Sequence, residues 1–355
     1  MKKGGEGMKK PVIAQLPEAL LPWYREHHRE LPWRKSDDPY PIWLSEIMLQ
    51  QTRVEAVKGY YQQFLDALPT VEALSVADDA LLHKLWEGLG YYSRVRNLKK
   101  AAVQIMECHG GIFPQAYEDI LALPGVGEYT AGAVSSIAFD QPRAAVDGNV
   151  LRVISRLTED PTPIEDPAFK RRVKAQLEQV YPKEAGAFTQ ALMELGATLC
   201  GPNRAPQCEL CPCNGFCGGC LHKTAQSFPV RKPKAPRREE KRTVFILSCD
   251  GRYALEKRPD KGLLAGLYQF PNCLEQLEPE QALEAVEKLG LQPKELKRQV
   301  YRQHIFTHIR WDMVGIYMEV REPAGAFLWL TGEEIEKQAA LPTAFRQFWE
   351  EINHV

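Results

Sequence analysis

The spacing of apolar residues changes once along this chain of 355 residues. From Pro17 to about Leu221, apolar side chains recur at helical spacing, and segments such as "VLRVISRL" and "FTQALMELGATL" repeat the pattern. One such series is Ile47, Val54, Val57, Tyr61, Leu65 and Leu68. We therefore expect the first two-thirds of the chain to be all-helical.

Beyond this region, strands are expected. "TVFILSCDGRYALEKR" contains two strand-like runs around Asp250-Gly251, which is a strong hairpin signal. "QALEAVEKLG" then predicts a helix and "DMVGIYMEV" another strand. This last third is typical of an α+β domain.

The composition of the intervening and terminal segments sets the expected domain boundaries. Residues 229 to 242, "PVRKPKAPRREEKR", hold seven basic residues, two acidic residues and three prolines, as a solvated linker does. We predict a disordered tail at 1–14, a helical domain at 15–225, a linker at 226–242 and an α+β domain at 243–355. There are no internal repeats.

Composition and charge narrow the class of protein without naming a partner. At 44% hydrophobic and 26% charged residues, the chain is an ordinary globular protein, and its net charge of −1 neither supports nor excludes nucleic-acid binding. The opening "MKKGGEGMKK" lacks the apolar run of a signal peptide, and no apolar stretch has transmembrane length. We expect a monomer in the cytoplasm with no membrane association.

The cysteines are clustered. Of nine in the chain, five fall within thirteen residues, at Cys208, Cys211, Cys213, Cys217 and Cys220, with Cys200 just upstream. Without an export signal, this clustering indicates a metal site rather than a disulfide framework. The spacing alone allows either a [4Fe–4S] cluster or zinc.

Two further segments carry candidate chemistry. In "LPGVGEYTAGAV", Gly125 and Gly127 can form a tight turn whose uncovered amides, at a helix start, would hold a phosphate oxygen; a plain turn between helices is the alternative. Asp147 precedes the helix "NVLRVISR", where it can cap that helix and also stay ionised. In "SEIMLQQTRV", Glu46 and the pair Gln50 and Gln51 look like a surface that contacts something polar.

Together these motifs resemble a known family. The segments "SEIMLQQTRV", "WEGLGYYSRVRNL", "LPGVGEYTAGAV" and "VDGNVLRV" and the cysteine cluster, in this order, resemble the helix-hairpin-helix DNA glycosylases, and within them the adenine glycosylase (MutY) branch. The resemblance extends from about Leu31 through the C-terminal domain. It implies excision of adenine mispaired with 8-oxoguanine or guanine, by a monofunctional enzyme acting at the nucleoid of a bacterium.

The resemblance also implies roles for individual residues. Glu46 matches the general acid that protonates adenine, and Asp147 matches the residue that stabilises the oxocarbenium-like sugar. Tyr129 stands at a catalytic position that distinguishes members of the superfamily. The positions matching the adenine pocket are Trp33, Arg34 and Gln190. Those matching DNA contacts are Leu49, Gln51, Tyr91, Gly125 and Gly127.

The cysteines match a [4Fe–4S] motif over residues 200–217, with one departure. Family members usually place six residues between the first two cysteines, whereas "GPNRAPQ" makes seven, and Cys213 and Cys220 are extra. The ligands implied are Cys200, Cys208, Cys211 and Cys217, although Cys220 could replace one of them.

The C-terminal domain resembles the family's Nudix-like module. Its helix keeps Glu284 and Glu287 but has Leu283 and Lys288 where a hydrolytic Nudix helix has an arginine and a glutamate, so we expect binding rather than hydrolysis. "IFTHIRW" resembles the loop that reads 8-oxoguanine, which assigns that contact to Phe306, Thr307 and His308.

Three other interpretations compete with this one. An endonuclease III-like enzyme would need a lysine where Tyr129 stands, and a phenol cannot form a Schiff base. A non-catalytic mismatch-binding protein would leave both Glu46 and Asp147 without a chemical role. A nucleotide-pool Nudix hydrolase is disfavoured by the altered Nudix helix.

Overall fold

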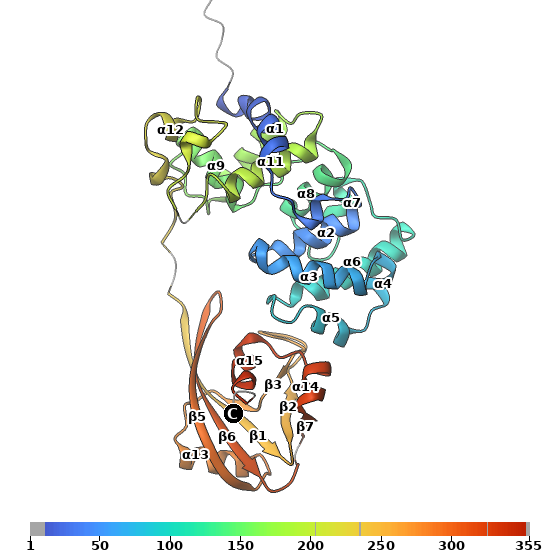
Figure 1. Ribbon diagram of the computed structural model, residues 1–355, viewed down its shortest axis with the longest axis vertical. Helices are drawn as coiled ribbons and strands as arrows, with labels where there is room; N and C mark the ends of the chain where they lie inside the picture. Colours follow the sequence, from blue (N-terminus) through green and yellow to red (C-terminus); the bar gives the residue numbers. More distant parts are fainter. Residues whose placement is uncertain (1–10, 203, 234–235, 325, 353–355) are drawn as a thin grey trace, which may run out of the picture. The chain divides into compact units, whose positions relative to one another are not determined.

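The computed structural model describes residues 11–202, 204–233, 236–324 and 326–352. The chain forms two compact units: one comprises Met1–Val76 and Asn97–Pro233, and the other Ala77–Arg96 and Lys234–Val355 (Figure 1). The first is called the helical unit below and the second the C-terminal unit. No described helix is both long enough and apolar enough to span a bilayer.

The helical unit is built from α-helices joined by short turns and 3₁₀ helices, as the apolar spacing predicts. The helices of this region of the chain, including those at the division between the units, are α1 Leu16–His27, α2 Pro39–Leu49, α3 Val54–Ala67, α4 Val71–Val76, α5 Asp79–Leu85, α6 Ser93–His109, α7 Tyr117–Leu121, α8 Glu128–Phe139, α9 Gly148–Thr158, α10 Pro167–Glu178, α11 Ala185–Ala197 and α12 Gly218–Leu221. The 3₁₀ helices are η1 Val12–Gln15, η2 Pro32–Arg34, η3 Cys208–Leu210 and η4 Ala225–Ser227.

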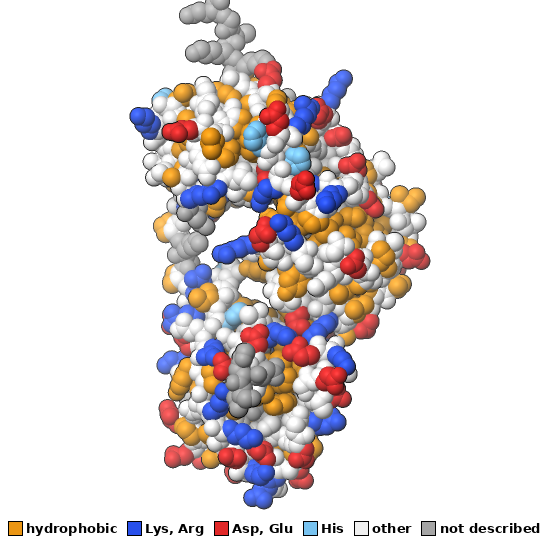
Figure 2. All heavy atoms as spheres, in the orientation of Figure 1, with side chains coloured by type: hydrophobic (Ala, Val, Ile, Leu, Met, Phe, Trp, Pro, Cys, Tyr) orange, Lys and Arg blue, Asp and Glu red, His pale blue; other side chains and the backbone are white. Residues whose placement is uncertain are grey.

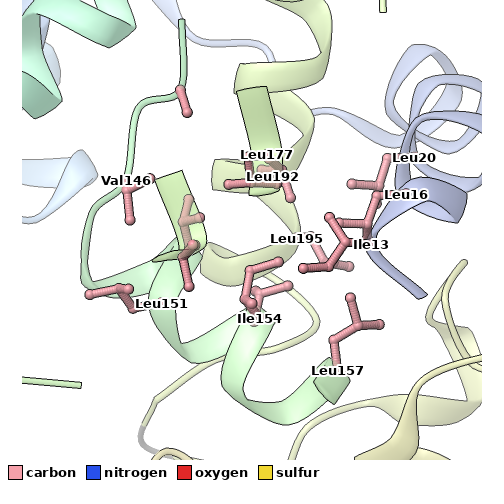
Figure 3. Packing of buried hydrophobic residues seen from close by; sticks show 14 of the residues in the cluster. Ile13, Leu16, Leu20, Val146, Leu151, Ile154, Leu157, Leu177, Leu192 and Leu195 are labelled. Carbon is pink, nitrogen blue, oxygen red and sulfur yellow. The ribbon is translucent and has the colours of Figure 1, made fainter. Parts of the chain in front are cut away.

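A core of leucine, isoleucine and valine side chains joins α1, α9, α10 and α11 (Figure 3). Leu16 and Leu20 of α1 are fully buried in it, as are most apolar residues on the inner face of α9. Ile13 of η1 is also buried there. The predicted tail 1–14 is therefore wrong at its end, because Ile13 removes apolar surface from water; residues 1–10 lie outside the described residues.

Small residues bring α8 close to its neighbours. A Cβ placed on Gly132 would lie 2.6 Å from the Ala144 carbonyl oxygen, and one on Gly186 of α11 would lie 2.9 Å from the Ser136 carbonyl oxygen of α8. These contacts fix α8 between the segment before α9 and helix α11. The small side chains of "TAGAV" thus permit this close approach.

The C-terminal unit contains a mixed sheet with helices on both faces (Figure 1). Its central strands, β1 and β6, run parallel, and β2 and β5 flank them antiparallel. Helix α15 packs on one face and α13 on the other. The elements are β1 Arg238–Cys249, β2 Arg252–Lys257, β3 Tyr268–Gln269, β4 Asn272–Cys273, α13 Pro279–Lys288, β5 Pro293–Ile305, β6 Ile309–Val320, β7 Leu328–Thr331, α14 Gly332–Gln338 and α15 Thr343–Glu350.

The hairpin predicted at Asp250-Gly251 is confirmed. Both residues have positive φ, +46° and +75°, as a two-residue turn between twisted strands requires.

The linker prediction of 226–242 is wrong at its C-terminal end, because β1 already begins at Arg238 and pairs with Ile309 of β6. Backbone pairing with a long neighbouring strand thus overrides a composition typical of a linker. On the face seen in Figure 2, basic and acidic side chains are interspersed over this unit.

Candidate functional site

A cavity of about 170 Å³ lies within the helical unit. It is lined from η2, α2, α8, α11 and the segment before α9. Seven of the residues singled out in the sequence line it: Trp33, Arg34, Glu46, Leu49, Tyr129, Asp147 and Gln190. Residues distant in the chain, including both predicted catalytic carboxylates, therefore meet in one place.

Glu46 is a buried carboxyl group on α2, with only 5% of the residue exposed. The sequence suggested that this stretch is a polar surface; at Glu46 that interpretation is wrong, because the side chain is directed into the cavity. Burial raises its pKa from 4.5 to about 7, opposed by the hydrogen bond from Tyr129 and by the charge of Arg34. Glu46 can therefore hold and release a proton near neutral pH.

Tyr129 lies in the first turn of α8 and contacts Glu46 directly. Its hydroxyl donates a hydrogen bond of 2.7 Å to Glu46 Oε2. Burial and the neighbouring carboxylates raise the pKa of Tyr129 well above its usual value, so the phenol stays neutral and remains a donor. It fixes the orientation of the Glu46 carboxyl group.

Asp147 caps α9, as the sequence predicts, and faces the same cavity. Its carboxylate accepts hydrogen bonds from the Val150 amide at 2.8 Å and from Asn149 Nδ2 at 2.6 Å. Burial nevertheless raises the pKa of Asp147, an effect that the sequence argument from the helix start did not anticipate. Capping and a place in the cavity thus coexist in one residue.

Two residues of the predicted base pocket contact neighbouring tyrosine side chains. Trp33 is buried and makes an edge contact with Tyr61, with ring centroids 5.4 Å apart. Gln190 Oε1 accepts a hydrogen bond of 3.1 Å from the Tyr24 hydroxyl. Trp33 is therefore both a packing residue and part of the cavity wall.

Sequence reasoning missed an ion-pair group in the same wall. Glu194 of α11 is fully buried and pairs with Arg29 and with Arg34, and all three line the cavity. A signal was present, because Glu194 lies four residues after Gln190 on one face of an otherwise apolar helix.

The segments with a predicted role in DNA contact differ in backbone geometry. Helix α2 ends at Leu49, and Gln51 is exposed with a φ of +59°, so the helix does not continue through the two glutamines. Leu49 is half-buried and lines the cavity. Gly125 has a φ of +78°, and a Cβ there would lie 2.6 Å from Asn97 Cβ. Gly127 is extended, at −105°, and precedes α8.

The cysteine cluster forms a second cavity in the helical unit. Cys200, Cys208, Cys211, Cys217 and Cys220 line it, whereas Cys213 is buried in the neighbouring hydrophobic core. Arg156 donates a hydrogen bond of 3.2 Å to Cys200 Sγ. Within the described ranges, no three Cys, His, Asp or Glu side chains converge closely enough to hold a metal ion. The donor set, five thiols at one cavity beside a guanidinium, fits a group that takes thiolate ligands.

The C-terminal unit brings two other predicted contacts together. Tyr91 Oη lies 2.9 Å from Thr307 Oγ1, although 216 residues separate them in the chain. Tyr91 is 45% exposed and has a φ of +49°, an uncommon backbone conformation for tyrosine. Thr307 and His308 are exposed in the turn between β5 and β6, whereas Phe306 packs against Trp311 with centroids 4.7 Å apart. The turn therefore presents two of the three residues to solvent.

Comparison with known proteins agrees with this geometry. The family model for the HhH-GPD superfamily of base excision DNA repair proteins matches residues 44–182, and that for the NUDIX domain matches residues 242–351. The chain is 34% identical to the adenine DNA glycosylase of Homo sapiens, over 93% of this chain and 72% of that protein.

The chain belongs to the adenine DNA glycosylase family.

Further relatives support this assignment. The chain is 31% identical to an adenine DNA glycosylase of Buchnera aphidicola, over 87% of this chain and 88% of that protein. The structure of a thermostable thymine-DNA glycosylase matches this one with a TM-score of 0.54 and 28% sequence identity. The match covers 59% of this chain and 97% of the thymine-DNA glycosylase chain. The chain is thus a DNA repair glycosylase with a helix-hairpin-helix domain and a Nudix-like domain, which confirms the predicted family and fold class.

Proposed function

We propose that this protein hydrolyses the N-glycosidic bond of adenine paired with 8-oxoguanine or guanine in duplex DNA. The observation that carries the proposal is the buried carboxyl group of Glu46, with a pKa of about 7, in the same cavity as Asp147. Neutral adenine is a poor leaving group, so its release requires an acid that is still protonated at neutral pH. Membership of the adenine DNA glycosylase family supports adenine as the base.

The two carboxyl groups have different tasks in the proposed mechanism. Glu46 donates its proton to N7 of the flipped-out adenine, and Tyr129 keeps the carboxyl group oriented for that transfer. As the glycosidic bond breaks, positive charge develops on the sugar, and the Asp147 carboxylate stabilises it. Asn149 and the Val150 amide hold Asp147 in place, and water then adds to the sugar. Trp33, Arg34 and Gln190 bound the space for the base.

The remaining DNA contacts follow from the positions of the turns. Leu49 and Gln51 enter the base stack as adenine leaves it, and the amides at the start of α8, near Gly125 and Gly127, bind a backbone phosphate. Tyr91, Phe306, Thr307 and His308 contact the base opposite adenine. The hydrogen-bond distance between Tyr91 and Thr307 supports assigning them to one recognition site.

The enzyme is proposed to be monofunctional. A lyase of this superfamily forms an imine through a lysine amine, whereas here the hydroxyl of Tyr129 is held by Glu46. The Nudix-like domain is proposed to bind DNA without hydrolysing nucleotides, because Leu283 and Lys288 occupy the positions described above. The protein acts as a monomer in the bacterial cytoplasm, at the nucleoid.

The cysteine cavity is proposed to hold one [4Fe–4S] cluster. Cys200, Cys208, Cys211 and Cys217 would be its ligands, and all four line the cavity. A cluster held by these ligands would tie together residues 200–217, which follow α11, and would supply no group to base release. With a cluster bound, Arg156, which donates a hydrogen bond to Cys200 Sγ, would offset part of the negative charge of the thiolate ligands.

The test is an incision assay on end-labelled duplexes that differ in one base pair. A duplex with adenine opposite 8-oxoguanine should yield a strand break at the adenine only after alkali, while adenine opposite thymine should yield none. A break without alkali, or a covalent adduct trapped by borohydride, would contradict monofunctionality. No abasic product at all would contradict the proposed function.

A further inference from the structure

Glu194 is a buried charge in the wall of the cavity for which the mechanism above has no use. It lies on α11 within "ALMELGA", and its side chain has no exposed surface. Burying a carboxylate costs free energy unless its charge is compensated and its oxygens are hydrogen-bonded. Its contacts therefore indicate what the residue does.

Those contacts fix two guanidinium groups. Arg29 binds both oxygens of Glu194, through Nε at 2.6 Å and Nη2 at 3.0 Å. Arg34 Nη2 donates to Glu194 Oε2 at 2.7 Å, and Arg34 Nη1 donates to the Arg29 carbonyl oxygen at 3.0 Å. The three side chains form one unit in which each arginine has little freedom to turn.

The position of Arg34 matters because its charge acts on Glu46. Arg34 is only 10% exposed at its side chain, and its guanidinium lowers the pKa of Glu46. A cation that swung closer, or lost its compensating anion, would lower that pKa further. The ionisable groups that share the cavity with Glu46 are Arg29, Arg34, Tyr129, Asp147 and Glu194.

We propose that Glu194 is a positioning residue for base release: it holds Arg34 against the cavity wall and offsets its charge, so that Glu46 keeps its proton at neutral pH. The proposal rests on the role proposed for Glu46 above. Glu194 acts through Arg34 and Arg29 and does not itself touch the reacting atoms.

The test is the pH dependence of single-turnover adenine release from an adenine:8-oxoguanine duplex at fixed salt. In the wild type, the rate should fall as Glu46 loses its proton. Glu194→Gln leaves two arginines with no anion between them, so this fall should move to lower pH by about one unit. Arg34→Met removes the cation and should move it to higher pH. A residue with only a structural role would change the rate without moving the two profiles in opposite directions.

Two controls keep the outcome interpretable. Glu184→Gln releases Arg25 from an exposed ion pair outside the cavity and should leave the profile unchanged. If Glu194→Gln alone does not fold, as judged by thermal unfolding, Arg34→Met is compared with Arg34→Met/Glu194→Gln, and the double variant should lose activity at lower pH than the single one.

The possible results separate the two proposals. A wild-type rate without a fall near neutral pH would overturn the assignment of Glu46 as the acid. A fall that is present in the wild type and unmoved in the Glu194 variants would overturn the role of Glu194 alone.

Discussion

Tyr129 donates a hydrogen bond of 2.7 Å to Glu46 across two helices, α8 and α2, in a cavity that both side chains line. Burial raises the pKa of Glu46, while this hydrogen bond lowers it. The balance leaves that pKa at about 7, where a carboxyl group can act as an acid under physiological conditions.

Replacing Tyr129 by Phe should therefore shift the pH profile upward. Without the hydroxyl donor the ionised carboxylate is less stable, so the pKa of Glu46 rises and release of adenine should persist to higher pH than in the wild type. The measurement is the single-turnover rate between pH 6 and 9, scaled to the maximum of each variant. Tyr181→Phe removes a half-buried hydroxyl that binds Thr189 outside the cavity and serves as control. A downward shift would show that the hydroxyl does not stabilise the ionised form.

Glu46→Gln should make the folded protein more stable at alkaline pH. The pKa of Glu46 is about 7 in the folded state against 4.5 ordinarily, so the stability that its protonated form contributes is present below pH 4.5 and is lost as pH rises to 7. A glutamine side chain does not ionise, so the variant does not lose this stability. At pH 8 its free energy of unfolding should exceed that of the wild type by up to about 3 kcal/mol. Thermal unfolding at pH 5 and pH 8 measures this gain. An equal difference at both pH values would mean that Glu46 is not protonated in the folded state.

The sequence predicted most of the catalytic group because the relevant signals are local. Asp147 stands directly before a helix, and Glu46 and Tyr129 lie in distinctive motifs that resemble the family. Glu194 was missed because its meaning depends on Arg29 and Arg34, about 160 residues earlier in the chain. The spacing from Gln190 places Glu194 on the same face of α11, but its pairing with arginines that distant is set by the packing of that helix.

Errors at element ends have a similar origin. Ile13 was assigned to a disordered tail because the residues before it are charged and rich in glycine, but it is buried in the core of α1 and α9. The basic, proline-rich composition around Arg238 is typical of a linker, but Arg238 pairs with Ile309 on the neighbouring strand β6. In both cases a tertiary contact overrides the local composition.

Changing Thr307 to Ala should reduce discrimination between 8-oxoguanine and guanine opposite adenine. One polar contact to a base edge contributes ~1–3 kcal/mol, so the ratio of the two excision rates should fall about fivefold or more. Thr307 is preferred to Phe306 for this test because Phe306 packs on Trp311, and its loss would disturb the fold.

Paired duplexes that differ only in the opposite base give the ratio at fixed salt. Thr343→Ala, an exposed threonine of α15 in the same unit, is the control. If both rates fell equally in the Thr307 variant, the turn would be a general DNA contact and not a reader of the oxidised base.

The purified protein should be yellow-brown, with broad absorption near ~400 nm and roughly four irons per chain. Cys211→Ala should lose this iron, whereas Cys213→Ala, a buried thiol outside the cysteine cavity, should retain it. Iron and acid-labile sulfide are measured alongside the spectrum. Cys220→Ala should also retain the iron if the four predicted ligands hold the cluster. A colourless protein with stoichiometric zinc would contradict the assignment.

The most direct test of the account is adenine release by Glu46→Gln on a duplex with adenine opposite 8-oxoguanine. Gln has the shape of the carboxyl group and can accept the Tyr129 hydrogen bond, but it has no proton to give. We predict that the wild type releases free adenine in a single turnover at pH 7, while the variant binds the duplex with similar affinity and releases none. Release by the variant at a rate within a few-fold of the wild type would contradict the assignment of Glu46 as the acid.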